Sequence, residues 1–194
     1  MSESSIKSYS VLAQLREATR PAHQQLEATL DLLDERLTVE DYTKILGKFY
    51  GFWHAWQPLA GRLMDDAAFT RPRQRLHLLT NDLTALGMSA AAIDALPACP
   101  MPALHTAAAA LGSFYVMEGS TLGGRVIEKN LLARLGLARE SGGSYFAGYG
   151  DQTGLMWRDF LARLNAAPFT DADEINLGAA ATFACLTSWF AGTN

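Results

Sequence analysis

Apolar residues recur at steps of three and four along most of the chain, and this spacing is typical of amphipathic helices. The clearest such face joins Leu12, Leu15, Thr19, Ala22, Leu26 and Leu30. Alternating β-branched runs bounded by hairpin turns, which would predict strands, are nearly absent. We therefore predict an all-α fold, with roughly seven or eight helices around one core.

Local signals predict where several helices begin and end. Thr38 with Asp41 resembles a capping box, so a helix is expected to start near Thr38. Around Pro21 two alternatives stay open: Thr19 caps a new helix with Pro21 in its first turn, or one helix is kinked there. Further helices are expected near 72–86, ended by Gly87, in the stretch "SAAAIDAL", and near 151–165 and 171–190.

The longest helical segment, from about 103 to 135, contains Gly119, Gly123 and Gly124 and is expected to be broken there. A glycine inside a helix costs roughly 1 kcal/mol relative to alanine. Gly119 and Gly123 share a helix face, and Gly124 widens the bare strip. The strip favours either close helix packing or a kink, or else the approach of a flat ligand to the backbone. The later stretch "ARESGGSYFAGYG" is predicted to be a mobile, glycine-rich loop.

Composition narrows the class of protein. The 194 residues fit a single domain over 1–194, with a flexible N-terminus over 1–8. The net charge of −4 and the lack of a basic region argue against nucleic acid. The apolar run "TAAAALGSFYVM" is too short to span a membrane, and "MSESSIKSYS" has no secretory apolar core. Cys99 and Cys185 lie far apart in sequence, so we expect no disulfide framework, no zinc site and a cytoplasmic location.

Few motifs for chemistry are present. The four histidines, His23, His54, His77 and His105, form neither an HExxH motif nor a pair of ExxH units. The chain has no Walker loop, GxGxxG or GxSxG. What remains are sites that need one or two special side chains and a suitable shape. A haem pocket is such a site, because the porphyrin supplies four of the iron's ligands.

His23, in "LREATRPAHQQLE", is the candidate metal ligand. Glu27 lies one helical turn on and could accept the second ring N–H, which would direct the other nitrogen at a metal. Arg16 lies two turns earlier, where it could meet an anionic group of a ligand. The alternative is a boundary histidine with ordinary helix ion pairs.

Together, "LREATRPAHQQLE" and "YVMEGSTLGGRVI" resemble the first-helix and distal-helix motifs of the haem oxygenase family, in particular its bacterial biliverdin-forming branch. The resemblance implies that His23 binds the haem iron on the proximal side. It implies that Gly119, Gly123 and Gly124 let a kinked distal helix lie against the haem. Arg16 and Tyr115 would meet the haem propionates, with Arg125, Arg158 and Arg163 as further candidates.

One position departs from part of the family. Mammalian-type members carry an aspartate after the first distal glycine, where it organises water near bound oxygen, and this chain has Ser120. Bacterial relatives also lack that aspartate. The water would then be held by Ser120, by backbone carbonyls, or by a residue that the sequence does not identify.

The implied reaction is oxidation of haem by O₂ to biliverdin, CO and Fe²⁺, with haem as both substrate and cofactor. Gly119, Ser120 and Gly123 would line the reaction space. Without a flavin or nicotinamide motif, electrons are expected from an external reductase or a ferredoxin-type donor. Whether the product supplies a bilin-binding photoreceptor or the reaction serves to release iron stays open. Two alternatives are a haem carrier or sensor without turnover, and an all-α interaction protein in which both motifs serve packing.

Overall fold

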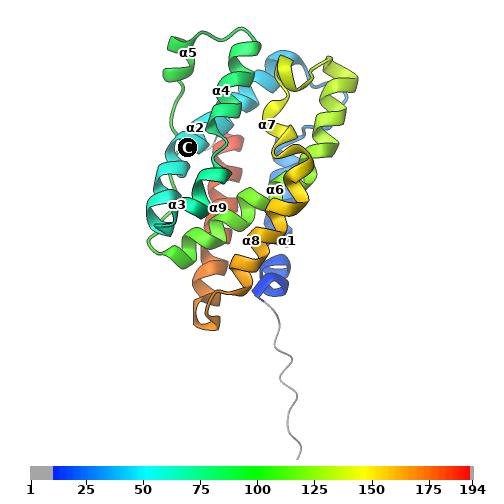
Figure 1. The fold of residues 1–194 in the computed structure, drawn as a ribbon. Coiled ribbons are helices and arrows are strands. Elements are labelled where there is room, and N and C mark those ends of the chain that lie inside the picture. The colour runs from blue at the N-terminus through cyan, green and yellow to red at the C-terminus, as the bar shows by residue number, and fades with distance from the viewer. Residues whose placement is uncertain (1–10, 193–194) are drawn as a thin grey trace, which may run out of the picture.

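The computed structural model describes residues 11–192, and within them every regular element is a helix. Figure 1 shows the arrangement of nine α-helices, with four single-turn 3₁₀ segments between them. The α-helices are α1 (Val11–Leu30), α2 (Val39–Met64), α3 (Ala67–Thr70), α4 (Leu76–Ala85), α5 (Ala90–Asp94), α6 (Ala107–Leu135), α7 (Ser144–Ala147), α8 (Thr153–Asn165) and α9 (Ala172–Ala191). The 3₁₀ segments are η1 (Arg71–Arg73), η2 (Arg139–Ser141), η3 (Gly150–Gln152) and η4 (Phe169–Asp171).

The predicted all-α class is confirmed. The helix number exceeds the prediction because α3 and α7 are single turns with no periodic pattern of their own. The flexible segment predicted for residues 1–8 lies outside the described residues, so the domain bounds of 1–194 stay a prediction. No helix within 11–192 is long and apolar enough to cross a membrane.

Helix α1 resolves the alternatives at Pro21, because it runs unbroken through the proline. Thr19 does not cap a new helix: its hydroxyl donates to the carbonyl of Leu15 at 2.6 Å. The predicted apolar face is the buried one, with Leu15 and Leu26 in the core. At the start of α2, Thr38 accepts a hydrogen bond from the backbone N–H of Asp41 at 3.1 Å, as the capping signal predicts.

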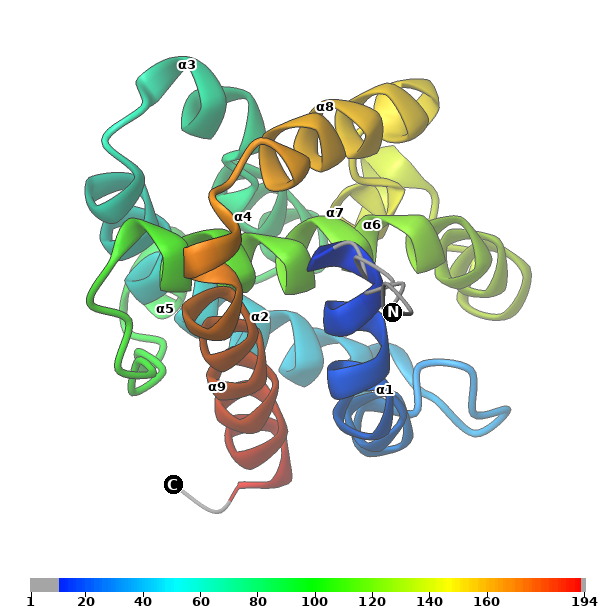
Figure 2. The same ribbon diagram turned by 90° about the horizontal axis from the view of Figure 1, so that it is seen from below.

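Helix α6 crosses the centre of the molecule (Figure 2), α9 packs against it, and α1 packs in turn on α9. The crossing of α6 and α9 depends on two glycines. A Cβ on Gly112 would collide with the carbonyl of Ile175, and one on Gly178 would collide with the carbonyl of Ala109. Close helix packing through bare backbone therefore occurs in α6 at Gly112, about two turns before Gly119.

The predicted break in α6 at the glycine cluster is wrong, because the helix continues from Ala107 to the left-handed cap at Gly136. It nevertheless changes direction midway, and both ribbon views show the bend (Figures 1 and 2). Glycine neighbours favour bending, as do side-chain hydrogen bonds back to the preceding turn. Ser120 and Thr121 make such bonds, to the carbonyls of Met117 and Glu118 at 2.7 and 2.6 Å.

Two other segments differ from their predictions. The helix expected near 72–86 divides into η1 and α4, because Arg75 at the junction has a non-helical backbone (φ −123°, ψ 3°). The glycine-rich stretch expected to be a mobile loop instead contains α7 and buries Tyr145 and Phe146. The carboxylate of Asp82 accepts hydrogen bonds from the backbone N–H groups of Ser144 and Tyr145, at 2.9 and 2.7 Å. This buried cap explains the order, since it satisfies the free N–H groups of α7.

Candidate functional site

A cavity of about 500 Å³ lies between α1 and α6, with α9 closing one side. Its size is within the range of small-molecule and cofactor sites, roughly 300–1,000 Å³. All eight residues that the sequence assigned to a site line it: Arg16, His23, Glu27, Tyr115, Gly119, Ser120, Gly123 and Gly124. Residues about a hundred positions apart are therefore brought to one cavity, because α1 and α6 both pack against α9.

On the α1 wall, His23 projects a partly exposed imidazole, with 53% of its side chain accessible. Its Nδ1 lies 3.4 Å from Oε2 of Glu27, one helical turn on. The ring also packs edge-on against Phe183 of α9, with centroids 5.9 Å apart. The carboxylate beside Nδ1 leaves Nε2 as the nitrogen available to a ligand in the cavity.

On the α6 wall, the three glycines are not equivalent. An added Cβ on Gly119 or Gly123 would meet nothing within 4 Å, so their missing side chains leave open space at the cavity. An added Cβ on Gly124 would collide with the carbonyl of Phe146 in α7. Gly124 thus permits close packing of α7, while Gly119 and Gly123 present bare backbone to the cavity.

The remaining walls suit a flat, apolar molecule with charged edges. Side chains of Leu26, Phe49, Phe146, Phe183 and Leu186 line the cavity. Arg16 and Tyr115 add a cation and a phenol to the lining. A haem fits this set: one imidazole for the iron, bare backbone on a facing wall, apolar sides for the porphyrin and polar groups for its propionates.

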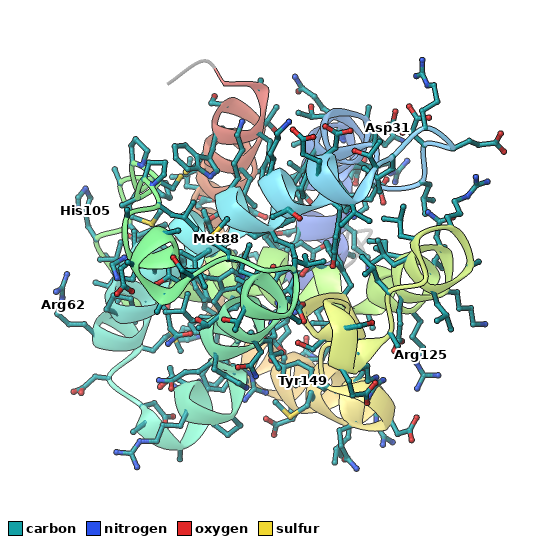
Figure 3. The ribbon with its side chains drawn as sticks, turned by 90° about the horizontal axis from the view of Figure 1, so that it is seen from above. Asp31, Arg62, Met88, His105, Arg125 and Tyr149 are labelled. Carbon is teal, nitrogen blue, oxygen red and sulfur yellow. The ribbon has the colours of Figure 1, made fainter. Side chains whose placement is uncertain are left out.

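The three arginines left open by the sequence, Arg125, Arg158 and Arg163, do not line the cavity. Arg125 pairs with Asp151 at 3.2 Å, and Figure 3 shows it pointing outward. Arg163 pairs with Asp66 at 2.7 Å. These contacts account for two of the three as surface ion pairs.

Arg75 is a residue of the cavity that sequence reasoning missed. It is 3% exposed and lines the cavity beside the bend of α6. Its Nη2 donates to the carbonyl of Met117 at 2.7 Å and lies 3.5 Å from Oγ of Ser120. Its guanidinium also lies over the Trp53 ring, 4.8 Å from the centroid. No local signal marks it, because "RPRQR" looks like an exposed basic cluster.

Glu118, in the same stretch of α6, takes part in a buried polar network with Tyr149 and Arg73. It is 1% exposed, accepts a hydrogen bond from the Tyr149 hydroxyl at 2.7 Å, and lies 3.6 Å from Nε of Arg73. Burial raises the pKa of Glu118, against the opposite influence of Arg75, of the Tyr149 hydrogen bond and of Arg73. Arg73 also pairs with Asp159 at 2.7 Å, so the network ties α6 to η1 and α8.

Several solved bacterial structures share this fold. The chain is similar to the heme oxygenase of Neisseria meningitidis in its NO- and CO-bound forms, with 23% identity, a TM-score of 0.75, and coverage of 96% of this chain and 92% of that one. Heme oxygenase from Leptospira interrogans is 17% identical, with a TM-score of 0.76 and coverage of 95% of this chain and 100% of that one. Heme oxygenase-1 of the cyanobacterium Synechocystis, in complex with heme, is 19% identical, with a TM-score of 0.70 and coverage of 96% of this chain and 93% of that one.

The sequence comparison assigns the chain to a family, which the shared fold alone does not do. No curated protein matches the chain at a significant level. A family model described as heme oxygenase, however, matches residues 9–192, which is nearly the whole chain. The chain therefore belongs to the haem oxygenase family, the enzymes that degrade haem.

Proposed function

We propose that the cavity holds haem with His23 on the iron, and that the protein cleaves it to biliverdin, CO and Fe²⁺. The observation that carries this proposal is that one cavity is lined by a histidine from α1 and by bare helix backbone from α6. His23 projects from α1, and the open backbone of Gly119 and Gly123 lines the same cavity from α6. Bound haem supplies the redox chemistry that activates O₂, and it is also the substrate.

The proximal side is built to orient a neutral imidazole. The carboxylate of Glu27 lies 3.4 Å from Nδ1 of His23, where it would favour the tautomer that has a free Nε2. The edge-on contact with Phe183 restricts rotation of the ring. A neutral imidazole donates less electron density to iron than a thiolate, which would favour early O–O cleavage.

The distal side excludes side chains where the reaction needs space. Bare backbone at Gly119 and Gly123 leaves room for O₂ and ordered water above the ring. We assign the organisation of that water to Arg75 together with Ser120, since the buried cation reaches both the serine hydroxyl and the Met117 carbonyl. Donors fixed in a site of low dielectric stabilise developing negative charge without reorganisation.

Arg16 and Tyr115 orient the substrate in this proposal. A guanidinium can hold a propionate through two hydrogen bonds, which sets the rotation of the ring and so the position attacked. Electrons come from an external reductase or a ferredoxin-type donor, with O₂ as the second substrate.

Haem titration followed by single turnover tests the proposal. Added haem should give a Soret band with one-to-one stoichiometry. A reductant in air should then replace that band with biliverdin absorbance. A stable oxygen complex without bilin formation would contradict turnover, and the absence of haem binding at micromolar concentration would contradict the site itself.

A further inference from the structure

The two cysteines of the chain lie side by side, although 86 positions separate them. Sγ of Cys99, in the loop before α6, is 3.6 Å from Sγ of Cys185 in α9. Both are free thiols, and both contact the carbonyl of Pro100, at 3.5 and 3.2 Å. Their separation in sequence predicted no disulfide framework, yet folding brings the two sulfurs into contact.

We propose that Cys99 and Cys185 form a peroxide-sensitive dithiol that closes to an intramolecular disulfide. A disulfide has an S–S bond of about 2.0 Å, so the sulfurs need to approach by less than the width of an atom. Neither cysteine lines the cavity between α1 and α6, so this proposal stands independently of the proposed function.

Both sulfurs are held on well-packed backbone. The N–H of Cys99 donates to the carbonyl of Gly51 in α2 at 3.1 Å. Gly51 allows this approach, because a Cβ there would collide with the carbonyl of Pro97. Cys185 lies within the long helix α9, between the buried residues Phe183 and Leu186. The pair is therefore positioned by the fold.

The surroundings assign different roles to the two thiols. Cys185 is partly exposed, whereas Cys99 is 3% exposed. The contact between the two sulfurs lowers the pKa of Cys185 and raises the pKa of Cys99. Because the thiolate is the nucleophile, Cys185 is the thiol that a peroxide meets and reacts with first.

The chemistry requires hydrogen peroxide as the oxidant. The Cys185 thiolate attacks one peroxide oxygen, so an S–O bond forms and the O–O bond breaks, and the departing hydroxide takes up a proton to become water. The Cys99 sulfur, after losing its proton, attacks the resulting sulfenic acid. An S–S bond forms, the S–O bond breaks, and a second water leaves. Two thiols lose two electrons in total, and one peroxide is reduced to two waters.

Closure would join the loop before α6 to the helix that supplies Phe183 and Leu186 to the cavity. A crosslink that closes so long a loop restricts the unfolded chain strongly. The oxidised protein should therefore have a higher melting temperature than the reduced protein.

The test uses the full chain without haem, so that bound haem cannot consume the oxidant. Reduced protein is treated with hydrogen peroxide, and remaining thiols are alkylated under denaturing conditions before intact-mass analysis. We expect the wild-type monomer to lose both alkylation sites and two hydrogen atoms, to gain thermal stability, and to return to two thiols with dithiothreitol.

Single substitutions test the roles. Cys99→Ser should accumulate a sulfenic acid at Cys185 that dimedone traps, and Cys185→Ser should oxidise several-fold more slowly than Cys99→Ser. The proposal is overturned if the wild-type protein keeps both thiols at a peroxide concentration that oxidises free cysteine. It is also overturned if oxidation yields only disulfide-linked dimers, or if the two variants react at equal rates. The wild-type thiol count decides the matter even if a variant fails to fold.

Discussion

The guanidinium of Arg75 donates a 2.7 Å hydrogen bond to the carbonyl of Met117, and this bond joins the start of α4 to the bend of α6. The same nitrogen lies 3.5 Å from the hydroxyl of Ser120. Because Arg75 is almost fully buried, its charge acts in a medium of low dielectric on whatever occupies the cavity. Ser120 therefore lies within reach of a buried cation that comes from the segment just before α4.

Replacing Arg75 should impair turnover more than haem binding. Arg75→Met removes the cation and both hydrogen bonds of its Nη2 at the bend, and we expect single-turnover biliverdin formation to slow by at least about tenfold. Ser120→Ala is the matched variant: it loses the hydrogen bonds of its hydroxyl to Met117 and Arg75, each worth about 1 kcal/mol, but it keeps the buried cation and should slow turnover less. Wild-type rates in Arg75→Met would contradict a distal role for this residue.

The three distal glycines should respond differently to substitution. Gly119→Ala fills open space within a helix, so it should raise the free energy of unfolding, by at most about 1 kcal/mol. Gly124→Ala forces α7 away at Phe146 and should lower that free energy by about 1–3 kcal/mol. Thermal unfolding should therefore show a higher melting temperature for Gly119→Ala than for the wild type, and a lower one for Gly124→Ala.

A larger side chain at the open position tests what that space is for. Gly123→Leu should fold, because nothing lies within 4 Å of its Cβ, yet it should block haem or O₂. Titration followed by the Soret band measures haem affinity, and single turnover measures the rate. Wild-type affinity together with the wild-type rate would mean that the glycines serve helix packing only.

His23→Ala should abolish imidazole ligation and turnover, with partial recovery on adding free imidazole. Glu27→Gln keeps the ligand but weakens its orientation, and haem affinity should fall by roughly tenfold or more. The matched control is His105→Ala, because His105 lies at the periphery of the molecule and outside the cavity lining (Figure 3). An unchanged Soret band with normal biliverdin formation in His23→Ala would refute the assignment.

Because of Glu118, the free energy of unfolding should fall as pH rises. Burial raises its pKa above the unfolded value of about 4.3, so between these two values the folded state binds more protons than the unfolded state. Its contribution to stability is therefore fully present below the unfolded pKa and is lost as pH rises through the folded pKa.

Glu118→Gln cannot titrate, so the free energy of unfolding of the wild type should fall relative to this variant as pH rises from 4. Tyr149→Phe removes a donor to the carboxylate, which should raise the folded pKa of Glu118 further and extend the fall to higher pH. Denaturant unfolding over a pH series measures both effects. Parallel curves for the wild type and Glu118→Gln would contradict the raised pKa.

The sequence by itself determined the helical class, the capping at Thr38 and the residues of two motifs that face one cavity. These features are local: they depend on which face of a helix is apolar and on a few adjacent residues. That is why the face of α1 through Leu15 and Leu26 could be predicted. His23 and Gly123 could be named because the motifs that contain them resemble those of the haem oxygenase family.

Only the tertiary structure decided which distant groups meet. It brought Arg75 to Ser120 across 45 positions and Cys99 to Cys185 across 86. It separated the packing glycine, Gly124, from the two that face open space, and it ordered α7 through the buried carboxylate of Asp82. The physical reason is that helical periodicity specifies an apolar face but not its partner, and the partner is chosen by the packing of the whole core.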